Sequence, residues 1–516
     1  MKLPKLPIGV QHFTTMREEN YLYIDKTEFV YKLANRGGAF FLSRPRRFGK
    51  SLFVHTLAEL AAGRRDLFEG TWIADKWDWQ RKYPVLHFKF AEMSFKEVGL
   101  TAAILKTLRT MCATHGIVPE TDDLKDLFVQ LLTELAAKEG KIVLLIDEYD
   151  KPIIQYMESH KMPQAIENQE IMRNFYGPLK DKGDCLHLVF ITGVSKFTKV
   201  SLFSEVNHLD DLTLNPDFAT AFGWTQTEVE AHFEPHIQHF LQKNTDHTRD
   251  SLLEKMKYWY NGYSWDGETS VYNPFGLLNF FTNRLFRNYW ISTGTPRFLS
   301  HLLLNKGQAE FENIVVSHSF LEQYNLETIQ SSALLFQTGY LTIKSMDKNE
   351  QTMTLDFPNM EVRESFYQFL ISYLGQQETD SKITLQYLKH ALQADDLERA
   401  SYILQDVFNN LPYDVYKASN EALYHGLIHI VFKYMGINIE SEVHTKFGRL
   451  DAVVQTNTHV YIFEFKFNKS AAVAMEQLKK RKYADKFRAS GKKIIGIGLN
   501  FTEATRSMDE WIVEEV

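Results

Sequence analysis

Two hydrophobic patterns alternate in the first 215 residues. Short apolar runs of strand length are separated by longer segments in which apolar residues recur at helical spacing. The runs predicted to be strands are residues 39–42, 85–90, 142–146 and 186–194. Because strands that alternate with helices form parallel sheets covered by those helices, this part is predicted to be an α/β domain with a largely parallel sheet.

The pattern changes after residue 215 and again near the C-terminus. The elements predicted there are a mainly helical segment at 216–335, a β-hairpin at 341–343 and 353–355, further helices within 361–435, and two strands, 459–467 and 493–501, around a helix at 471–487. The predicted boundaries are 1–215 for the first α/β domain, 216–345 for a helical, winged-helix-like extension, 346–384 for a linker and helical connector, and 385–516 for a second α/β domain.

The composition is that of a globular protein with well-filled cores. Of 516 residues, 44% are hydrophobic and 14% aromatic, which indicates two to four packed domains rather than disorder. The formal net charge of −7 argues against a global basic field for nucleic acid. Only two cysteines occur, which excludes a disulfide framework and a cysteine-rich zinc site. With no signal-peptide pattern and no apolar stretch of about 18 residues, the expected location is the cytoplasm.

Residues 44–51, with the sequence RPRRFGKS, carry the first candidate chemistry. They end in the Gly-Lys-Ser of a phosphate-binding loop, although Arg44 stands where the pattern G-x-x-x-x-G-K-[ST] begins with glycine. A strand before and a helix after them would direct backbone N–H groups toward one point, where a triphosphate can be held. The residues predicted to bind ATP are Arg46, Arg47, Phe48, Gly49, Lys50 and Ser51, with Lys50 on the β- and γ-phosphates and Ser51 on Mg²⁺. The alternative is a basic, solvated turn before an ordinary helix.

An acidic strand end supplies the partner that such a loop requires. The apolar run 142–146 is followed by Asp147 and Glu148, and parallel strands deliver their C-terminal residues to the crevice where ligands bind. Asp147 is predicted to bind the nucleotide's Mg²⁺ through water, and Glu148 to polarise the attacking water as a catalytic residue. The next apolar run ends in hydroxyls; Thr192 and Ser195 either sense the γ-phosphate or satisfy backbone groups, and both interpretations stay open.

Several motifs in a fixed order resemble the bacterial AAA-ATPase-like family across residues 5–345. They are RPRRFGKSL at 44–52, IDEYDKP at 146–152, GVSKFTKVSLFSEVNHLDDL at 193–212, YNGY at 260–263, YNP at 272–274 and TGTPRFL at 293–299. An arginine at the first loop position is itself typical of this family. The resemblance implies a P-loop NTPase sheet and an ATP-binding protein that uses Mg²⁺.

The second candidate chemistry lies in the C-terminal α/β domain and has the form D-(x)n-E-x-K. A predicted turn separates Asp451 from Glu464 and Lys466, whose side chains, two positions apart on a strand, share one face. Two facing carboxylates suit Mg²⁺ or Mn²⁺, and a lysine beside them can activate water or stabilise a charged transition state. Glu421, on an upstream helix, is a candidate for a further metal-binding carboxylate. The alternative is a solvated hairpin with a surface ion pair.

Two observations favour the metal site over the surface ion pair. Phe463 and Phe465 flank Glu464, so the strand is predicted to be buried, and a buried Glu or Lys must be paired or act as a ligand. In addition, residues 465–493 contain ten basic and two acidic residues in an otherwise acidic protein. This surplus suits a phosphate backbone, so DNA or RNA is the predicted partner, with a solvated helix face as the alternative.

The region 385–516 resembles the PD-(D/E)XK nuclease superfamily, in the branch fused behind AAA-ATPase-like domains. The residues that match are Glu421 as the first-helix acid, Asp451, Glu464 and Lys466 as the D…E-x-K core, and Gln477 as the polar position on the next helix. The resemblance implies a metal-dependent phosphodiesterase fold with its catalytic residues in that core.

Three function hypotheses follow. The first is an ATP-binding module, expected to be an ATPase, that is coupled to or regulates a metal-dependent nuclease acting on DNA or RNA; an oligomer is compatible with the sequence. The alternative is a nucleotide-regulated scaffold or signalling protein with a catalytically inert nuclease fold, against which the intact D…E-x-K set argues. The third is an enzyme acting on nucleotides or another phosphoester, which the basic stretch disfavours.

Other conspicuous residues are interpreted as structural. Asp210 and Asp211 are expected to form a solvated turn and the start of a helix. Trp224, Trp265 and Trp290 are expected to be core or interface anchors, and Arg297 is expected on the surface rather than at the nucleotide.

Overall fold

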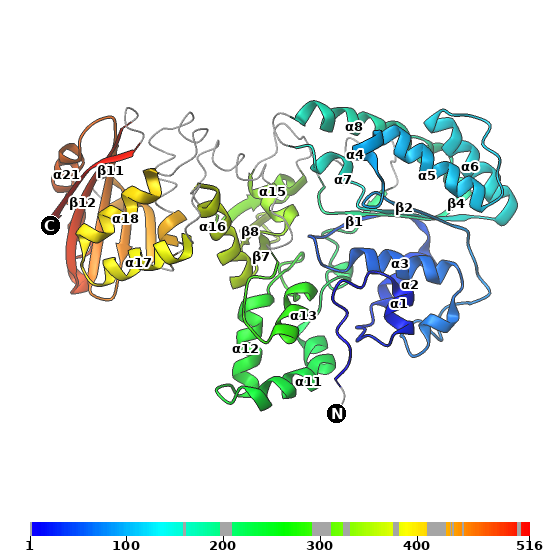
Figure 1. Cartoon of the computed structure of the whole chain (residues 1–516), viewed down its shortest axis with the longest axis horizontal. Helices are drawn as coiled ribbons and strands as arrows, with labels where there is room; N and C mark the ends of the chain where they lie inside the picture. The colour runs from blue at the N-terminus through cyan, green and yellow to red at the C-terminus, as the bar shows by residue number, and fades with distance from the viewer. Residues whose placement is uncertain are drawn as a thin grey trace. The chain divides into compact units, whose positions relative to one another are not determined.

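The structure is a computed structural model and describes residues 3–157, 161–196, 209–290, 311–322, 331–374, 381–409, 430–433, 435, 438–445, 448–502 and 507–516 (Figure 1). The chain divides into two compact units, one formed by Met1–Thr293 with Glu312–Val362 and the other by Gly294–Phe311 with Arg363–Val516. Each unit contains a five-stranded sheet. Within the described ranges, none of the helices has the length and hydropathy that a bilayer crossing requires.

The first unit carries a parallel sheet in the order β2-β3-β4-β1-β5. Its strands are β1 (Gly38–Ser43), β2 (Val85–Lys89), β3 (Ile142–Asp147), β4 (Leu186–Gly193) and β5 (Leu209–Asp211). Helices α1 (Phe13–Glu18), α2 (Thr27–Arg36) and α3 (Lys50–Ala61) cover one face, and α5 (Leu100–Thr114), α6 (Leu124–Glu139) and α8 (Met162–Tyr176) cover the other (Figure 1). The parallel α/β fold and its four predicted strands are confirmed.

Strand β5 corrects the expectation of a solvated turn at Asp210 and Asp211. Both residues pair in register with β1, and Asp211 forms an ion pair with the buried Lys196 at 2.9 Å. Aspartate is depleted in strands, so the local pattern favours a turn. The pairing strand comes from a distant part of the chain, and its hydrogen bonds override that local preference.

Strand β3 shows why the strands of this sheet can be predicted from the sequence. It lies inside the sheet, and all six of its residues are buried. A strand buried on both faces is a continuous apolar run. The polar residue that ends it, Asp147, therefore lies at the carboxyl edge of the sheet, the edge at which β1 also ends.

Three helices follow the parallel sheet, namely α11 (Gln226–Lys243), α12 (Arg249–Tyr260) and α13 (Pro274–Asn283). Each begins at a side-chain cap. Thr225 and Thr248 form capping boxes, and Asn273 accepts hydrogen bonds from the first N–H groups of α13. The helical extension is thus specified by local signals at each helix start.

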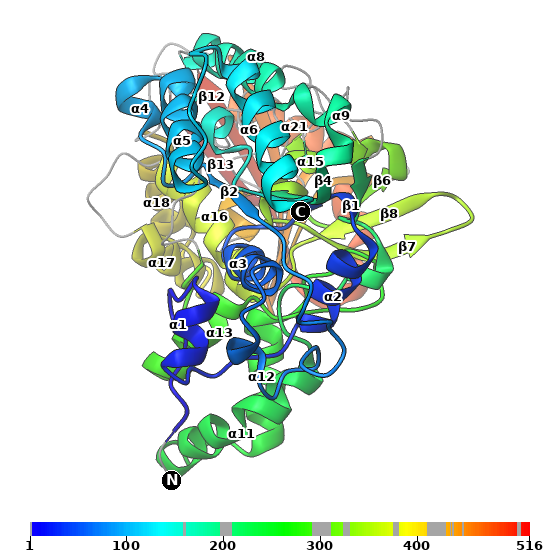
Figure 2. The same cartoon turned by 90° about the vertical axis from the view of Figure 1, so that its right-hand side faces the viewer.

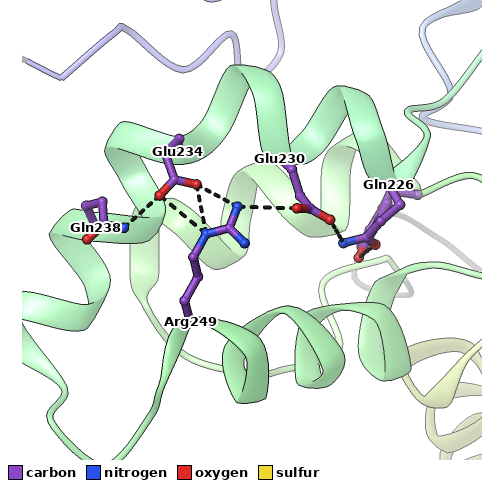
Figure 3. Close-up of polar contacts among 6 residues, drawn as sticks. Gln226, Glu230, Glu234, Gln238 and Arg249 are labelled. Atoms are coloured by element: carbon purple, nitrogen blue, oxygen red, sulfur yellow. Dashed lines mark hydrogen bonds and ion pairs between the residues drawn. The ribbon is translucent and has the colours of Figure 1, made fainter.

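A row of polar side chains joins α11 to α12 (Figure 3). The α11 members, spaced by four residues on one helix face, are Gln226, Glu230, Glu234 and Gln238. Arg249, the first residue of α12, donates to Glu230 at 3.3 Å and to Glu234 at 2.9 Å. Because these groups are partly exposed, the row adds little stability and mainly aligns the two helices.

A three-stranded antiparallel sheet completes the first unit, in the order β6-β8-β7. Its strands are β6 (Ile314–Ser317), β7 (Thr342–Asp347) and β8 (Thr352–Asp356), with helices α15 (Ser331–Thr338) and α16 (Met360–Leu374) nearby in the chain. The hairpin β7–β8, seen along its length in Figure 2, confirms the predicted hairpin. The pattern does not predict β6, because Val316 alone among its four residues is buried.

The second unit contains a mixed sheet in the order β13-β12-β11-β10-β9. Its strands are β9 (Asn438–Thr445), β10 (Gly448–Gln455), β11 (His459–Phe467), β12 (Lys493–Thr502) and β13 (Ser507–Glu515), and its helices include α17 (Ser381–Gln393), α18 (Leu397–Asn409) and α21 (Ala471–Lys480). Strands β11 and β12 are parallel, while the other neighbours are antiparallel. The predicted C-terminal α/β fold is confirmed, with β9 and β13 as strands that the pattern does not predict.

The helix predicted at 471–487 is shorter in the structure. Helix α21 ends at Lys480, Lys482 adopts a left-handed φ of 47°, and two 3₁₀ turns follow. Apolar spacing continues past the helix because Tyr483 and Phe487 are buried in the same core as Leu478. Burial alone therefore produced the helical periodicity beyond α21.

Candidate phosphate-binding loop and candidate metal site

Residues 44–49 connect strand β1 to helix α3. Five of the six residues of β1 are buried, so the strand holds the start of the loop in place. Gly49, the N-cap of α3, has a φ of 87°, a left-handed conformation that glycine adopts without steric cost. Arg47 has a φ of 70° as well. These two residues turn the chain so that the first N–H groups of α3, which have no intrahelical acceptor, lie beside the loop.

Lys50 is buried against the loop that it follows. Its Nζ donates to the carbonyl oxygens of Arg44 at 2.9 Å and Pro45 at 2.8 Å. Burial lowers the pKa of Lys50, and the negative charges of the acids at the end of β3 act in the opposite direction. A phosphate bound at this loop would compete with the two carbonyls for the ammonium group.

Ser51 and Asp147 meet at the carboxyl edge of the sheet. Burial raises the pKa of the Asp147 carboxylate, and the neighbouring Ser51 hydroxyl opposes that shift. Asp147 Oδ1 is buried and has no hydrogen-bond partner. A buried carboxylate oxygen is costly unless a donor or a cation satisfies it. A hydroxyl and a carboxylate are the hard oxygen donors that Mg²⁺ prefers, so the residues fit such an ion.

Glu148 lies one residue beyond the strand. It is about one-third exposed, and its carboxylate forms an ion pair with Lys151 at 3.0 Å. Its φ of 53° is uncommon for a residue with a Cβ atom and marks a sharp turn directly after β3. To polarise a water, Glu148 would have to exchange Lys151 for that water, so its catalytic role stays a prediction.

Asp150 is a buried acid that the sequence patterns do not single out. Its Oδ2 accepts hydrogen bonds from the N–H groups of Val194 at 3.0 Å and Ser195 at 2.7 Å, and from Ser195 Oγ at 2.7 Å. Thr192 Oγ1 donates to Leu42 O at 2.7 Å. Both hydroxyls thus satisfy neighbouring groups, which favours the structural interpretation over the sensing of a γ-phosphate. No periodic signal marks Asp150, because its partners follow 45 residues later.

Strands β10 and β11 bring the D…E-x-K residues together. The antiparallel register pairs Ala452 with Phe463, and Asp451 and Glu464 are the next residues of the two strands. The Asp451 carboxylate accepts a hydrogen bond from the Phe465 N–H at 2.7 Å. Lys466 Nζ donates to Glu464 Oε1 at 3.0 Å. The two β11 side chains therefore share one face, as the spacing of two residues predicts.

Glu464 is a buried carboxyl group, 1% exposed, beside a second carboxyl group. Burial and then the charge of Asp451 raise the pKa of Glu464 to about 7, and Lys466 opposes the shift. Its Oε2 is buried and has no hydrogen-bond partner. This unsatisfied oxygen and the neighbouring carboxylate are suitable ligands for a divalent cation, so the residues fit Mg²⁺ or Mn²⁺.

Helix α21 adds Gln477 to this site. Ser470 caps the helix by accepting a hydrogen bond from Val473 N–H, and the Gln477 amide donates to Glu464 Oε1. One turn later the exposed Arg481 donates to the Tyr483 hydroxyl at 3.1 Å. The position of Gln477 agrees with the one that the family resemblance implies.

Some of the basic side chains of residues 465–493 form ion pairs within the fold. Lys479 forms an ion pair with Glu514, and Lys493 forms one with Asp395 at 3.2 Å. Both acids lie outside that stretch of sequence, so part of the charge surplus is neutralised within the fold. Exposed basic residues remain at the end of α21 (Lys480, Arg481 and Lys482) and in the turns that follow (Lys486 and Arg488), with Arg488 paired to Asp485.

Some predicted features lie outside the described residues, namely Glu421, Arg297 and the motif residues 197–208 and 293–299. Among the residues that are described, no three His, Cys, Asp or Glu side chains form a group that could hold a metal ion. Each candidate ion site consequently rests on two oxygen-bearing side chains, Ser51 with Asp147 and Asp451 with Glu464.

Comparisons with known proteins match both regions. The family model described as "Predicted AAA-ATPase" (AAA-ATPase-like) matches residues 7–203, and the model of the PD-(D/E)XK nuclease superfamily matches residues 419–511. The chain is also 37% identical over 530 aligned positions to a protein of Azotobacter chroococcum mcd 1, with 100% of both chains covered. That relative is named "Uncharacterized protein in vnfD 5'region".

Proposed function

The chain belongs to the family of AAA-ATPase-like proteins with a C-terminal PD-(D/E)XK nuclease-superfamily domain, and on this basis we propose that it is an ATP-regulated nuclease. It binds ATP at residues 44–51 and cleaves phosphodiesters of DNA or RNA beside Asp451 and Glu464. The observation that carries the nuclease assignment is the buried, unpaired Oε2 of Glu464 next to a second carboxylate. Lys466 and Gln477 satisfy only Oε1, so a divalent cation would satisfy the remaining oxygen and offset the repulsion between the two carboxylates.

At the nuclease site each side chain has a distinct task. A Mg²⁺ or Mn²⁺ ion held by Asp451 and Glu464 would supply Lewis-acid stabilisation of the charge that develops on the phosphate. Lys466, whose ammonium group lies 3.0 Å from Glu464 Oε1, is placed to neutralise the charge that develops on a phosphate oxygen. Gln477 holds Glu464 Oε1 in position.

At the loop, Lys50 exchanges the carbonyls of Arg44 and Pro45 for the β- and γ-phosphates of ATP. Ser51 and Asp147 would hold the Mg²⁺ that accompanies the nucleotide, which would offset the negative charge of the phosphates. Glu148, directly after β3, orients the water for hydrolysis. ATP binding in this unit regulates cleavage by the other.

A cleavage assay tests the proposed function. The purified protein is incubated with single- and double-stranded DNA and RNA, with Mg²⁺ or Mn²⁺, and with or without ATP. Cleavage should require the divalent ion, and Asp451→Ala should reduce it by more than about 100-fold, since loss of outer-shell partners alone costs up to ~100-fold. Lys50→Ala should remove ATP binding and the effect of ATP on cleavage.

Glu515→Ala is the matched control, because Glu515 is an exposed acid of β13 in the same sheet and pairs with Ile495 rather than with a residue next to Lys466. It should cleave like the unmodified protein. Cleavage that survives Asp451→Ala would overturn the site assignment. A protein that cleaves none of the four substrates would instead support the regulated scaffold with an inert nuclease fold.

A further inference from the structure

Arg44, at the position of the first loop glycine, is completely enclosed by the fold. It is 1% exposed. Its NH1 donates to Ser43 O at 2.9 Å and to Thr213 O at 2.9 Å, and its NH2 donates to Phe218 O at 3.1 Å. The guanidinium group therefore ties the end of β1 to the segment that follows β5.

Aromatic side chains from the helical extension surround the same loop. The Arg44 guanidinium carbon lies 4.0 Å from the centre of the Trp265 ring. The Phe48 ring packs edge-on against Tyr263 at 4.8 Å and against Trp265 at 5.4 Å between ring centres. These are interactions in which a cation or a ring edge meets a π-face. The conformation of the loop is thus determined partly by residues more than 200 positions away.

A second contact fixes the next loop residue. Pro45 packs so closely on Gly339 that a Cβ atom at that glycine would lie 2.5 Å from Pro45 Cβ. The φ of Gly339 is 89°, which also requires glycine. Because Lys50 donates to the carbonyls of Arg44 and Pro45, the two anchored residues also determine where the ammonium group lies.

Burying the charged guanidinium group of Arg44 costs free energy, which indicates that the side chain has a role other than packing. Burial lowers the pKa of Arg44 to about 9, so the side chain stays charged at neutral pH, and Asp211 and Asp266 provide the neighbouring negative charge. Replacing a buried cation by an apolar residue of similar volume is often neutral or stabilising. A glycine here would leave three carbonyls and one face of Trp265 without their partner.

We propose that Arg44 is a positioning residue for nucleotide binding, which holds the phosphate loop open by tying it to residues 213–218 and to Trp265 of the helical extension. This inference rests on the proposed binding of ATP at the loop. Arg44→Gly restores the usual G-x-x-x-x-G-K-S pattern of phosphate loops. In this protein it should nevertheless weaken ATP binding.

Two measurements on the full-length protein test this proposal. The first is ATP affinity with Mg²⁺, where Arg44→Gly and Arg44→Met should each raise Kd by about tenfold or more, a change of about 1.4 kcal/mol. Arg44→Lys, which keeps a charge but fewer donors, should recover part of the loss. The second is limited trypsin digestion without nucleotide, followed by identification of cuts after Arg46 and Arg47. The bond between Arg44 and Pro45 resists trypsin, so the Arg44 variants lose no cleavage site. These cuts should be faster in Arg44→Gly.

The matched control is Arg17→Ala. Arg17 also donates to two backbone carbonyls, Leu67 O at 2.8 Å and Glu69 O at 2.5 Å, and lies over the Tyr23 ring. Its loss should lower the melting temperature without changing ATP affinity or cutting in the loop. If Arg44→Gly does not fold, Arg44→Met and Trp265→Leu carry the same test.

Each outcome separates the positioning role from the ATP site itself. Variants that fold, bind ATP as tightly as the unmodified protein and resist trypsin in the loop would overturn the role of Arg44. If the unmodified protein binds no ATP but the loop of Arg44→Gly is still cut faster than its own, the anchoring role of Arg44 is supported. The proposed nucleotide is then overturned.

Discussion

At the scale of single residues, both candidate sites are marked by buried charges. Lys50 lies on two carbonyls of its own loop, and Glu464 lies beside Asp451 with one oxygen unsatisfied. An ion that is buried without a full set of partners costs several kcal/mol. The proposed ligands, a phosphate for Lys50 and a divalent cation for Glu464, would supply the missing opposite charge.

Binding of Mn²⁺ to the C-terminal site should weaken as the pH falls below about 7. Burial and Asp451 raise the pKa of Glu464 to about 7, so the carboxyl group is increasingly protonated below that pH. Because a metal binds the ionised form, affinity should fall by up to about tenfold for each pH unit lost. Calorimetric titration of Mn²⁺ between pH 6 and 8, without ATP, measures this dependence.

The control for this titration is Glu515→Ala, which should show the same pH dependence as the unmodified protein. Asp451→Ala should bind Mn²⁺ weakly throughout. An affinity that stays constant between pH 6 and 8 would contradict the role of Glu464 as a ligand with a raised pKa.

At the scale of elements, local signals and tertiary packing contribute differently. The strand β3 and the capping boxes of α11 and α12 are specified by neighbouring residues. Neighbouring residues do not specify strand β5, which forms because it pairs with β1. They also do not specify where α21 ends, because the burial of Tyr483 continues the apolar spacing beyond the helix. The predictions were accordingly right for strands β1 to β4 and for hairpin β7–β8, and wrong at strand β5 and at the end of α21.

The cap of helix α13 provides a prediction at this scale. Asn273 is fully buried and accepts hydrogen bonds from the Phe275 and Gly276 N–H groups. Asn273→Ala should lower the free energy of unfolding by about 1–2 kcal/mol, the usual cost of losing such a cap. Thr248→Ala, at the exposed cap of α12, should cost less. Urea unfolding of the two variants measures the difference, and equal losses would contradict the effect of burial.

At the scale of the whole molecule, the chain consists of two compact units, each with a core of its own. The proposed ATP loop belongs to the first unit and the proposed metal site to the second. A ligand that binds only the folded form of one unit stabilises that unit by mass action.

Calorimetric unfolding should therefore show two transitions. Mg²⁺ with ATP should raise the midpoint temperature of one transition, and Mn²⁺ without ATP should raise that of the other. At a ligand concentration of 100 times the Kd, each ligand should add about 2.7 kcal/mol to the free energy of unfolding of its unit. Lys50→Ala should remove the first shift and Asp451→Ala the second. A single transition that both ligands move together would contradict separate unfolding of the two units.

The sequence by itself determined both families, the parallel α/β sheet, and the residues Lys50, Asp147, Asp451, Glu464 and Lys466 as candidates. These signals are local, because a phosphate loop, an apolar strand and an E-x-K pair are each formed by consecutive residues. Only the tertiary structure decided that Arg44 contacts Thr213, Phe218 and Trp265, that Asp150 holds Ser195, and that Gln477 holds Glu464. Each of these contacts joins distant segments, and its existence depends on how the core packs rather than on any local pattern.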